Sequence, residues 1–137
     1  MTDRLLRILI VDDDRDTRDL YRIVLETASC EVDEAGTLAD ALRAATNRLP
    51  DLVLADWMLP DGDGLALGRQ LRRLPALGEV PLLAITGVTM TRDELAAAHQ
   101  AGFNQVLEKP VTPAAILDAI RALLGVGGPF RPSSPDH

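Results

Sequence analysis

Three consecutive aspartates follow a short apolar run near the start of the chain, in the stretch ILIVDDDRD at residues 8–16. Adjacent carboxylates repel one another, so a strand that ends on Asp12, Asp13 and Asp14 carries an electrostatic cost. A bound divalent cation would offset that cost, because hard cations are typically held by carboxylate oxygens. Asp14 needs no metal, since negative charge is favourable at the N-terminus of a following helix. Asp12 and Asp13 therefore form a candidate metal-binding corner, although such a run by itself is more often a helix cap beside solvent.

The elements that must position this corner follow from the alternation of two hydrophobic periods. Short apolar runs that end at polar residues predict buried strands at 7–11, 51–55, 80–85 and 104–107. A weaker, alternating run at 30–35 predicts an edge strand. Amphipathic helical stripes lie between these runs. The clearest are Leu20, Tyr21, Val24, Leu25 and Ala28; Leu38, Ala41, Leu42, Ala45 and Leu49; and Ile116, Leu117, Ile120, Leu123 and Leu124. Strand and helix alternate five times, which predicts an α/β fold with an open, doubly wound, five-stranded parallel sheet.

Helix start signals and composition set the predicted boundaries. TLAD at 37–40 and TRDE at 91–94 resemble capping boxes, and Thr112 is a candidate N-cap before Pro113. Residues 1–125 are expected to form one domain. Residues 126–137 are rich in Gly, Pro and Ser and are expected to form a flexible tail.

The predicted sheet brings distant polar residues to one edge. In open parallel sheets, ligands bind outside the carboxyl ends of the strands. The strand ends place Asp12, Asp13, Asp56, Thr86 and Lys109 at that edge. We therefore expect three carboxylates, a hydroxyl and an ammonium group to converge there.

Four segments of the chain, in order, resemble the receiver domains of bacterial two-component response regulators, including the stand-alone chemotaxis receivers. ILIVDDD matches the opening acidic pair of that family, and DLVLADWMLPDGDG matches its phosphoacceptor segment. LLAITG matches the segment that carries the switch hydroxyl, and AGFNQVLEKP matches the final segment with its lysine before proline. The resemblance covers about residues 5–124, and it implies a flavodoxin-like (β/α)5 fold with strand order 2-1-3-4-5.

The resemblance also implies a role for each site residue. Asp56 would accept a phosphoryl group, with Lys109 and Thr86 contacting its oxygens. Mg²⁺ would be held directly by Asp13 and Asp56, through water by Asp12, and by the backbone carbonyl of Met58. The phosphoryl donor would be a phosphohistidine on a histidine kinase or a histidine phosphotransfer protein, and an unidentified protein would be the downstream target.

Several positions depart from the family pattern. Val106 stands where the family usually has Tyr or Phe, whose side chain moves inward when the threonine moves. Gly87 follows Thr86 at a position where a small residue is common, and it opens access to the site. Met58 and Val88 are both apolar and occupy positions that typically tune dephosphorylation. The coupling between phosphorylation and output is therefore expected to differ from the usual one.

Composition excludes several classes of partner. The chain has 14 Lys and Arg against 21 Asp and Glu, a net charge of −7, which argues against direct contact with nucleic acid. No apolar run approaches a membrane span. The single Cys30 cannot form an internal disulfide, so a reducing cytoplasm is expected.

Competing motifs fail on spacing. DGDG at 61–64 suggests a calcium loop, but the twelfth position counted from Asp61 is Arg72, where a bidentate Glu is required. The same stretch suggests an Asp-x-Asp phosphatase nucleophile, but WMLP separates it from the strand. No G-x-x-x-x-G-K phosphate loop is present. Two alternatives to a phospho-accepting receiver stay open: a degenerate receiver that serves as an interaction module, and a small α/β phosphatase.

Four further features receive structural interpretations. Trp57 is expected to be partly exposed beside the site, Cys30 to be a half-buried strand residue and His99 to be a surface residue. The stretch RQLRR at 69–73 is expected to be the solvated face of a helix.

Overall fold

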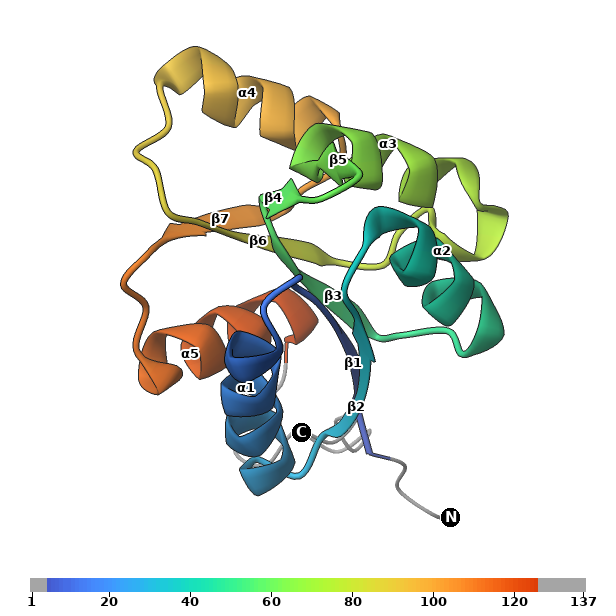
Figure 1. The fold of residues 1–137 in the computed structure, drawn as a ribbon, viewed down its shortest axis with the longest axis vertical. Helices are drawn as coiled ribbons and strands as arrows, with labels where there is room; N and C mark the ends of the chain where they lie inside the picture. Colours follow the sequence, from blue (N-terminus) through green and yellow to red (C-terminus); the bar gives the residue numbers. More distant parts are fainter. Residues whose placement is uncertain (1–4, 126–137) are drawn as a thin grey trace.

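The computed structural model describes residues 5–125, in which a five-stranded parallel sheet lies between two layers of helices (Figure 1). The strands of this sheet are β1 (Arg7–Val11), β2 (Glu31–Ala35), β3 (Leu52–Asp56), β6 (Leu82–Thr86) and β7 (Gln105–Glu108). The helices are α1 (Arg15–Thr27), α2 (Leu38–Asn47), α3 (Gly64–Arg73), α4 (Arg92–Gln100) and α5 (Pro113–Leu124), with a short 3-10 helix at Pro75–Leu77.

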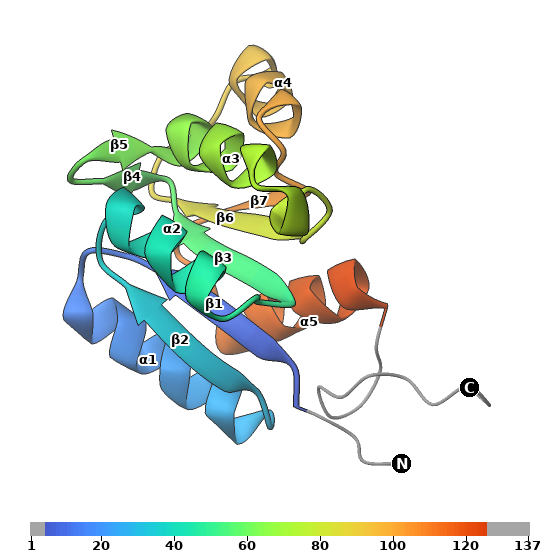
Figure 2. The ribbon, with the colours of Figure 1, turned by 90° about the vertical axis from the view of Figure 1, so that its right-hand side faces the viewer.

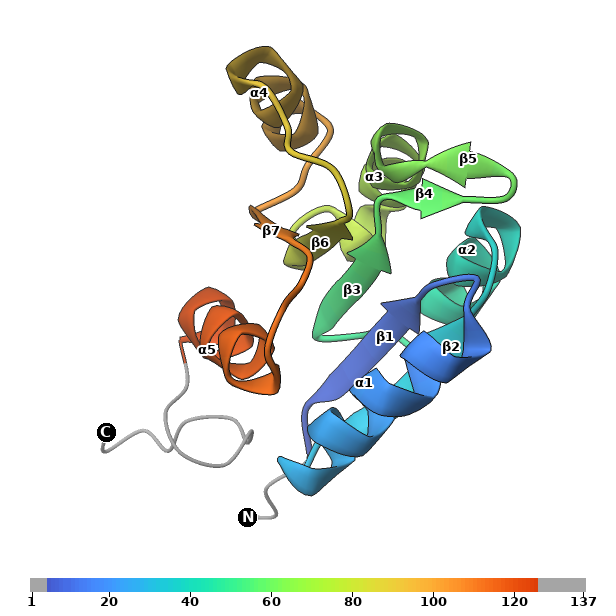
Figure 3. The ribbon, with the colours of Figure 1, turned by 60° about the vertical axis from the view of Figure 1, so that its left-hand side comes forward.

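The order of the strands is β2-β1-β3-β6-β7, which confirms the predicted 2-1-3-4-5 order for the main sheet. The views in Figures 2 and 3 show α1 and α5 on one face and α2, α3 and α4 on the other. Central strands are buried on both faces. In β1, Leu9 and Val11 join the core under α2, α3 and α4, whereas Ile8 and Ile10 join the core under α1 and α5. This two-sided burial explains the continuous apolar runs.

The helix starts agree with their sequence signals. Thr91 forms a complete capping box with Glu94, and the hydroxyls of Thr37 and Thr112 accept hydrogen bonds from the third residue of their helices. Two members of the predicted stripes were wrong. Leu20 is exposed on α1, and Leu49 lies beyond the end of α2 and is also exposed.

A small hairpin that the periodicity did not predict follows β3. It consists of β4 (Met58–Leu59) and β5 (Gly62–Asp63), which pair antiparallel. Its aspartates act as helix caps: Asp61 accepts hydrogen bonds from the first two amides of α2, and Asp63 accepts one from Ala66 in α3. These bonds explain the DGDG sequence without a calcium ion or a second nucleophile.

Two single-residue expectations, and one position of the stretch expected to be solvated, were wrong because they depend on tertiary contacts. Trp57 is buried, its ring lying against Gly64, where a Cβ atom would come within 2.2 Å of it. Cys30 is buried and precedes β2. Arg72, in the stretch expected to be solvated, turns inward and donates hydrogen bonds to the carbonyls of Leu77, Val80 and Gly102. His99 is exposed, as predicted.

None of the helices within residues 5–125 is long and apolar enough to cross a membrane. The predicted C-terminal tail, residues 126–137, lies outside the described residues.

Candidate functional site

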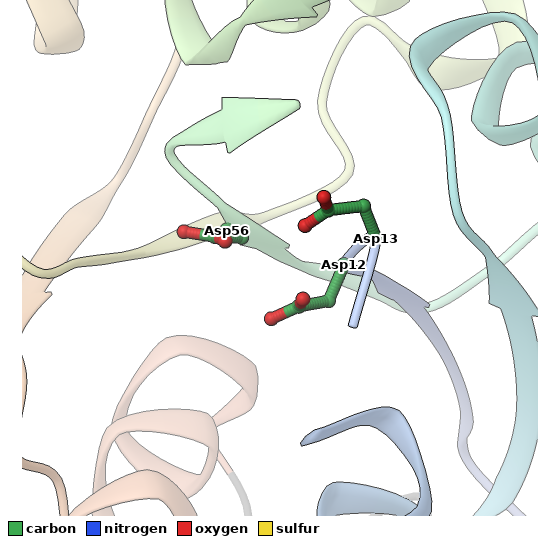
Figure 4. Close-up of side chains that lie close together, drawn as sticks. All are labelled: Asp12, Asp13 and Asp56. Carbon is green, nitrogen blue, oxygen red and sulfur yellow. The ribbon is translucent and has the colours of Figure 1, made fainter. Parts of the chain in front are cut away.

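Three carboxylates meet at the carboxyl ends of the central strands. Asp12 and Asp13 follow β1 directly, and Asp56 is the last residue of β3, which pairs with β1. One oxygen from each carboxylate lies within 4.8 Å of the others, and Figure 4 shows the three side chains gathered beside these strand ends. Oxygen atoms from several carboxylates in this proximity suit a hard divalent cation. The donor set therefore fits Mg²⁺.

Asp12 is the buried member of the cluster, with 2% of its surface exposed. Burial raises the pKa of its carboxyl group above the ordinary value, and the negative charge of Asp56 acts in the same direction. A hydrogen bond of 2.8 Å from the Asp14 amide to Asp12 Oδ1 opposes this rise in pKa. A bound cation would favour the ionised form that burial disfavours.

Lys109 completes the charge balance of the site. Its Nζ lies 3.9 Å from Asp56 Oδ1, and its backbone amide donates a hydrogen bond of 2.7 Å to the Thr86 carbonyl. The peptide bond between Lys109 and Pro110 is cis. The 3.9 Å distance therefore brings the ammonium group of the residue after β7 to the carboxylate at the end of β3, across the intervening strand β6.

Thr86 ends β6, the strand beside β3, and its side chain is buried. Its hydroxyl oxygen accepts a hydrogen bond of 3.2 Å from the Val88 amide, in the loop that leads to α4. Among the described residues, Asp12 and Thr86 are the buried side chains of polar type other than tyrosine and tryptophan, and both are predicted site residues. Burying a polar group costs free energy. In the described part of the chain, the fold buries such groups at the predicted site.

The rim of the site is apolar and open. Met58 lies two residues after Asp56 in β4, and Met58 and Val88 are both exposed. A Cβ atom at Gly87 would meet nothing within 4 Å. The Met58 and Val88 side chains, each two residues after a predicted site residue, are therefore open to solvent.

The sequence interpretation missed two neighbours of the acidic cluster on α1. Tyr21 was assigned to a core stripe, yet burial and the charges of Asp12 and Asp56 raise the pKa of its hydroxyl to about 12. Arg18, which no pattern singled out, contacts the Asp12 backbone. Helical periodicity shows which face is apolar but not which polar side chain turns back toward a strand end.

Comparison with known proteins agrees with this geometry. Residues 8–121 match the family described as response regulator receiver domain. An uncharacterized 14.6 kDa protein in the sodA1 3′ region of Leptolyngbya boryana is 38% identical over 114 residues, which cover 83% of this chain and 86% of that protein. The phosphate regulon transcriptional regulatory protein PhoB of Pseudomonas aeruginosa is 32% identical over 93% of this chain, but this chain spans only 56% of its length.

A solved structure with the same fold holds a magnesium ion. The receiver domain of the sensor histidine kinase PA1611 from Pseudomonas aeruginosa superposes with a TM-score of 0.80 at 26% identity. The match covers 90% of this chain and 100% of that domain, which has a magnesium ion coordinated in its active-site cleft. With the family match across most of its length, this chain belongs to the response regulator receiver domains of two-component systems.

Proposed function

We propose that this chain is a phospho-accepting receiver in which Asp56 takes a phosphoryl group from a phosphohistidine donor. The observation that carries this proposal is the position of Asp56. It ends a buried strand, shares a cluster with Asp12 and Asp13, and has the Lys109 ammonium 3.9 Å from its Oδ1.

The acidic cluster would hold Mg²⁺. Asp13 and Asp56 would be direct ligands, Asp12 would bind through water, and the Met58 carbonyl would complete the protein's share. When bound, the ion supplies positive charge that neutralises the phosphoryl oxygens.

Asp56, Lys109 and Thr86 would each have a separate role in the phosphoryl transfer. A carboxylate oxygen of Asp56 attacks phosphorus, the bond from phosphorus to the donor imidazole nitrogen breaks, and the electron pair of that bond leaves with the histidine. Lys109 offsets charge on the phosphoryl oxygens, and the Thr86 hydroxyl donates a hydrogen bond to one of them. The signal ends by hydrolysis: water attacks phosphorus, the bond from phosphorus to the Asp56 oxygen breaks, and inorganic phosphate leaves the restored carboxylate.

This chemistry serves signalling rather than turnover of an external metabolite, because receiver domains are signalling modules. The donor would be a histidine kinase or a histidine phosphotransfer protein, and the phosphorylated chain would act on a protein target. The net charge of −7 supports a protein rather than nucleic acid as the direct partner. We place the reaction in the cytoplasm.

One observation favours a second candidate, a receiver that acts as an interaction module without phosphorylation. Val106 replaces the usual aromatic residue, so one part of the usual switch is absent. The phospho-accepting function is favoured by the intact set of Asp12, Asp13, Asp56, Thr86 and Lys109.

Intact mass after incubation with Mg²⁺ and a small-molecule phosphodonor tests the assignment. The wild type should gain one phosphoryl group, and Asp56→Asn should gain none, because an amide oxygen is a poor nucleophile. Asp61→Asn is the matched control, since an asparagine oxygen can still cap α2 and this variant should be phosphorylated like the wild type. Equal phosphorylation of Asp56→Asn and the wild type would refute the assignment.

A further inference from the structure

Arg18 of α1 reaches from the helix to the backbone of the acidic corner. Its Nη1 donates a hydrogen bond of 2.6 Å to the carbonyl oxygen of Asp12, and its Nε donates one of 3.2 Å to Glu34 Oε1. The Arg18 side chain is 19% exposed, so little water competes for these bonds. One guanidinium therefore joins the acidic corner to the edge strand β2.

The Asp12 carbonyl is a sensitive point for the site. It belongs to the peptide plane between Asp12 and Asp13, and peptide planes are rigid. A rotation of this plane would turn the backbone bonds of both residues and redirect both carboxylates. The flanks of the plane are held by hydrogen bonds from the Asp12 amide to the Ala35 carbonyl and from the Asp14 amide to Asp12 Oδ1. Arg18 holds the plane itself.

The surroundings orient the Arg18 guanidinium. Glu34 accepts Arg18 on one carboxylate oxygen and Arg22 on the other, the latter at 2.6 Å. Gly36 leaves the space that the guanidinium occupies, because a Cβ atom there would lie 3.3 Å from Arg18 Nη1. Two independent features, an oriented ion pair and a small neighbour, thus support the same contact.

We propose that Arg18 is a positioning residue of the metal site, holding the peptide between Asp12 and Asp13 so that both carboxylates face Asp56. The proposal rests on the proposed function, since it concerns how the same site binds Mg²⁺ and accepts a phosphoryl group.

Charge and positioning predict opposite effects when Arg18 is removed. Deleting a nearby cation reduces repulsion with Mg²⁺ and would by itself strengthen Mg²⁺ binding. Losing the hydrogen bond to the Asp12 carbonyl would weaken Mg²⁺ binding, because residues that orient metal ligands typically contribute about 10-fold or more to affinity. The sign of the change therefore separates the two roles.

The chain supplies a matched control on the same helix. Arg22 binds the same Glu34 carboxylate and also pairs with Asp19 and Glu26. Within residues 5–125, no hydrogen bond or ion pair joins Arg22 to Asp12 or Asp13. Arg22→Met removes the same charge as Arg18→Met and leaves the Asp12 carbonyl bonded. We expect Arg18→Met to bind Mg²⁺ about 10-fold more weakly than Arg22→Met, measured by calorimetry and by fluorescence of Trp57, the single tryptophan.

A second variant disturbs the contact without changing charge. Gly36→Ala should crowd the Arg18 guanidinium and weaken Mg²⁺ binding by a smaller factor. If Arg18→Met fails to fold, Gly36→Ala still tests whether Arg18 positions the metal ligands. In the metal-free protein, amide NMR shifts of Asp13 and Asp14 should move in Arg18→Met and stay in place in Arg22→Met.

The outcomes distinguish failure of the role of Arg18 from failure of the proposed phospho-accepting function. A wild type that neither binds Mg²⁺ nor accepts a phosphoryl group overturns both. A wild type that does both, beside Arg18→Met and Gly36→Ala variants that bind Mg²⁺ as tightly as Arg22→Met, overturns the role of Arg18 alone.

Discussion

The acidic corner, at the carboxyl ends of β1 and β3, and α4, on one face of the sheet, are held very differently. The corner follows the fully buried end of β1, and backbone, side-chain and guanidinium hydrogen bonds fix Asp12 from several directions. In α4, Ala98 is the buried residue, and positions 91–96 are exposed. The proposed function would use both properties: a firmly held place for the chemistry and an element that can move after it.

The two ends of α4 also differ. At its C-terminal end a Cβ atom on Gly68 would lie 2.6 Å from the Ala101 carbonyl oxygen, so α3 and this end of α4 approach closely. Arg72 donates to the Gly102 carbonyl at 2.6 Å. At its N-terminal end, the preceding loop is linked to the site by the hydrogen bond from the Val88 amide to the Thr86 hydroxyl. We therefore expect α4 to pivot about its C-terminal end when Thr86 turns toward a phosphoryl group.

The largest effect is expected from removing the anchor of α4. Arg72→Met leaves three carbonyls, those of Leu77, Val80 and Gly102, without their donor, and it should lower the free energy of unfolding by about 3 kcal/mol. Urea denaturation measures this loss. Arg73→Met changes the exposed neighbour and should stay within about 0.5 kcal/mol of the wild type. Equal losses in the two variants would show that Arg72 anchors nothing.

Hydrogen exchange with and without beryllofluoride and Mg²⁺ should reveal the next largest effect. A phosphoryl analogue can shift α4 only through contacts that differ between the two states, and those contacts begin at Thr86. Protection should change in the loop and first turn, residues 87–95, more than around residues 100–103. Unchanged protection across residues 87–101, with the site fully occupied, would place the switch elsewhere.

A smaller effect is expected from the buried charge of the corner. The folded-state pKa of Asp12 is raised, chiefly by burial, so the ionised carboxylate is disfavoured in the metal-free fold. Asp12 therefore contributes most to the free energy of unfolding below the ordinary carboxyl pKa. This contribution is lost as the pH rises through the raised pKa of the folded state.

Asp12→Asn cannot ionise, yet its side-chain oxygen can still accept from the Asp14 amide. At neutral pH without metal it should therefore raise the Tm by about 3 °C, a gain that shrinks toward acidic pH. Thermal unfolding across pH checks this, with the exposed Asp118→Asn as control. A lower Tm, or a gain that does not depend on pH, would contradict it.

The sequence predicts what depends on local patterns and misses what depends on contacts between distant residues. The strand ends follow from local apolar runs, and parallel pairing then brings Asp12, Asp56 and Lys109 together without any knowledge of their contacts. Trp57 and Arg72 were assigned wrongly because their burial depends on partners distant in the sequence, Phe103 and the Gly102 carbonyl. The role of Arg18 is of the same kind. Periodicity records the average environment of a helix face, whereas a long side chain can leave that face to reach a backbone group.

The smallest effect is expected at Val106. Because this residue replaces the usual aromatic one, the exposure of its side chain should not change on phosphorylation. Val106 lies in β7, pairs with Ala84 and packs, half-buried, against the core under α2, α3 and α4. A β-branched side chain has few rotamers, so it can neither swing far nor cover much surface. Thiol labelling of Val106→Cys should therefore proceed at the same rate with and without beryllofluoride and Mg²⁺.

Labelling can be assigned to the introduced cysteine because the native one is protected. Cys30 is buried, and burial raises the pKa of its thiol to about 11, so it holds little reactive thiolate near neutral pH. Val88→Cys is the matched comparison, since Val88 is exposed in the loop that should move, and there the labelling rate should change. A change at position 106 as large as that at position 88 would mean that β7 takes part in the switch even without an aromatic residue, and the contrast between a fixed sheet and a mobile α4 would have to be abandoned.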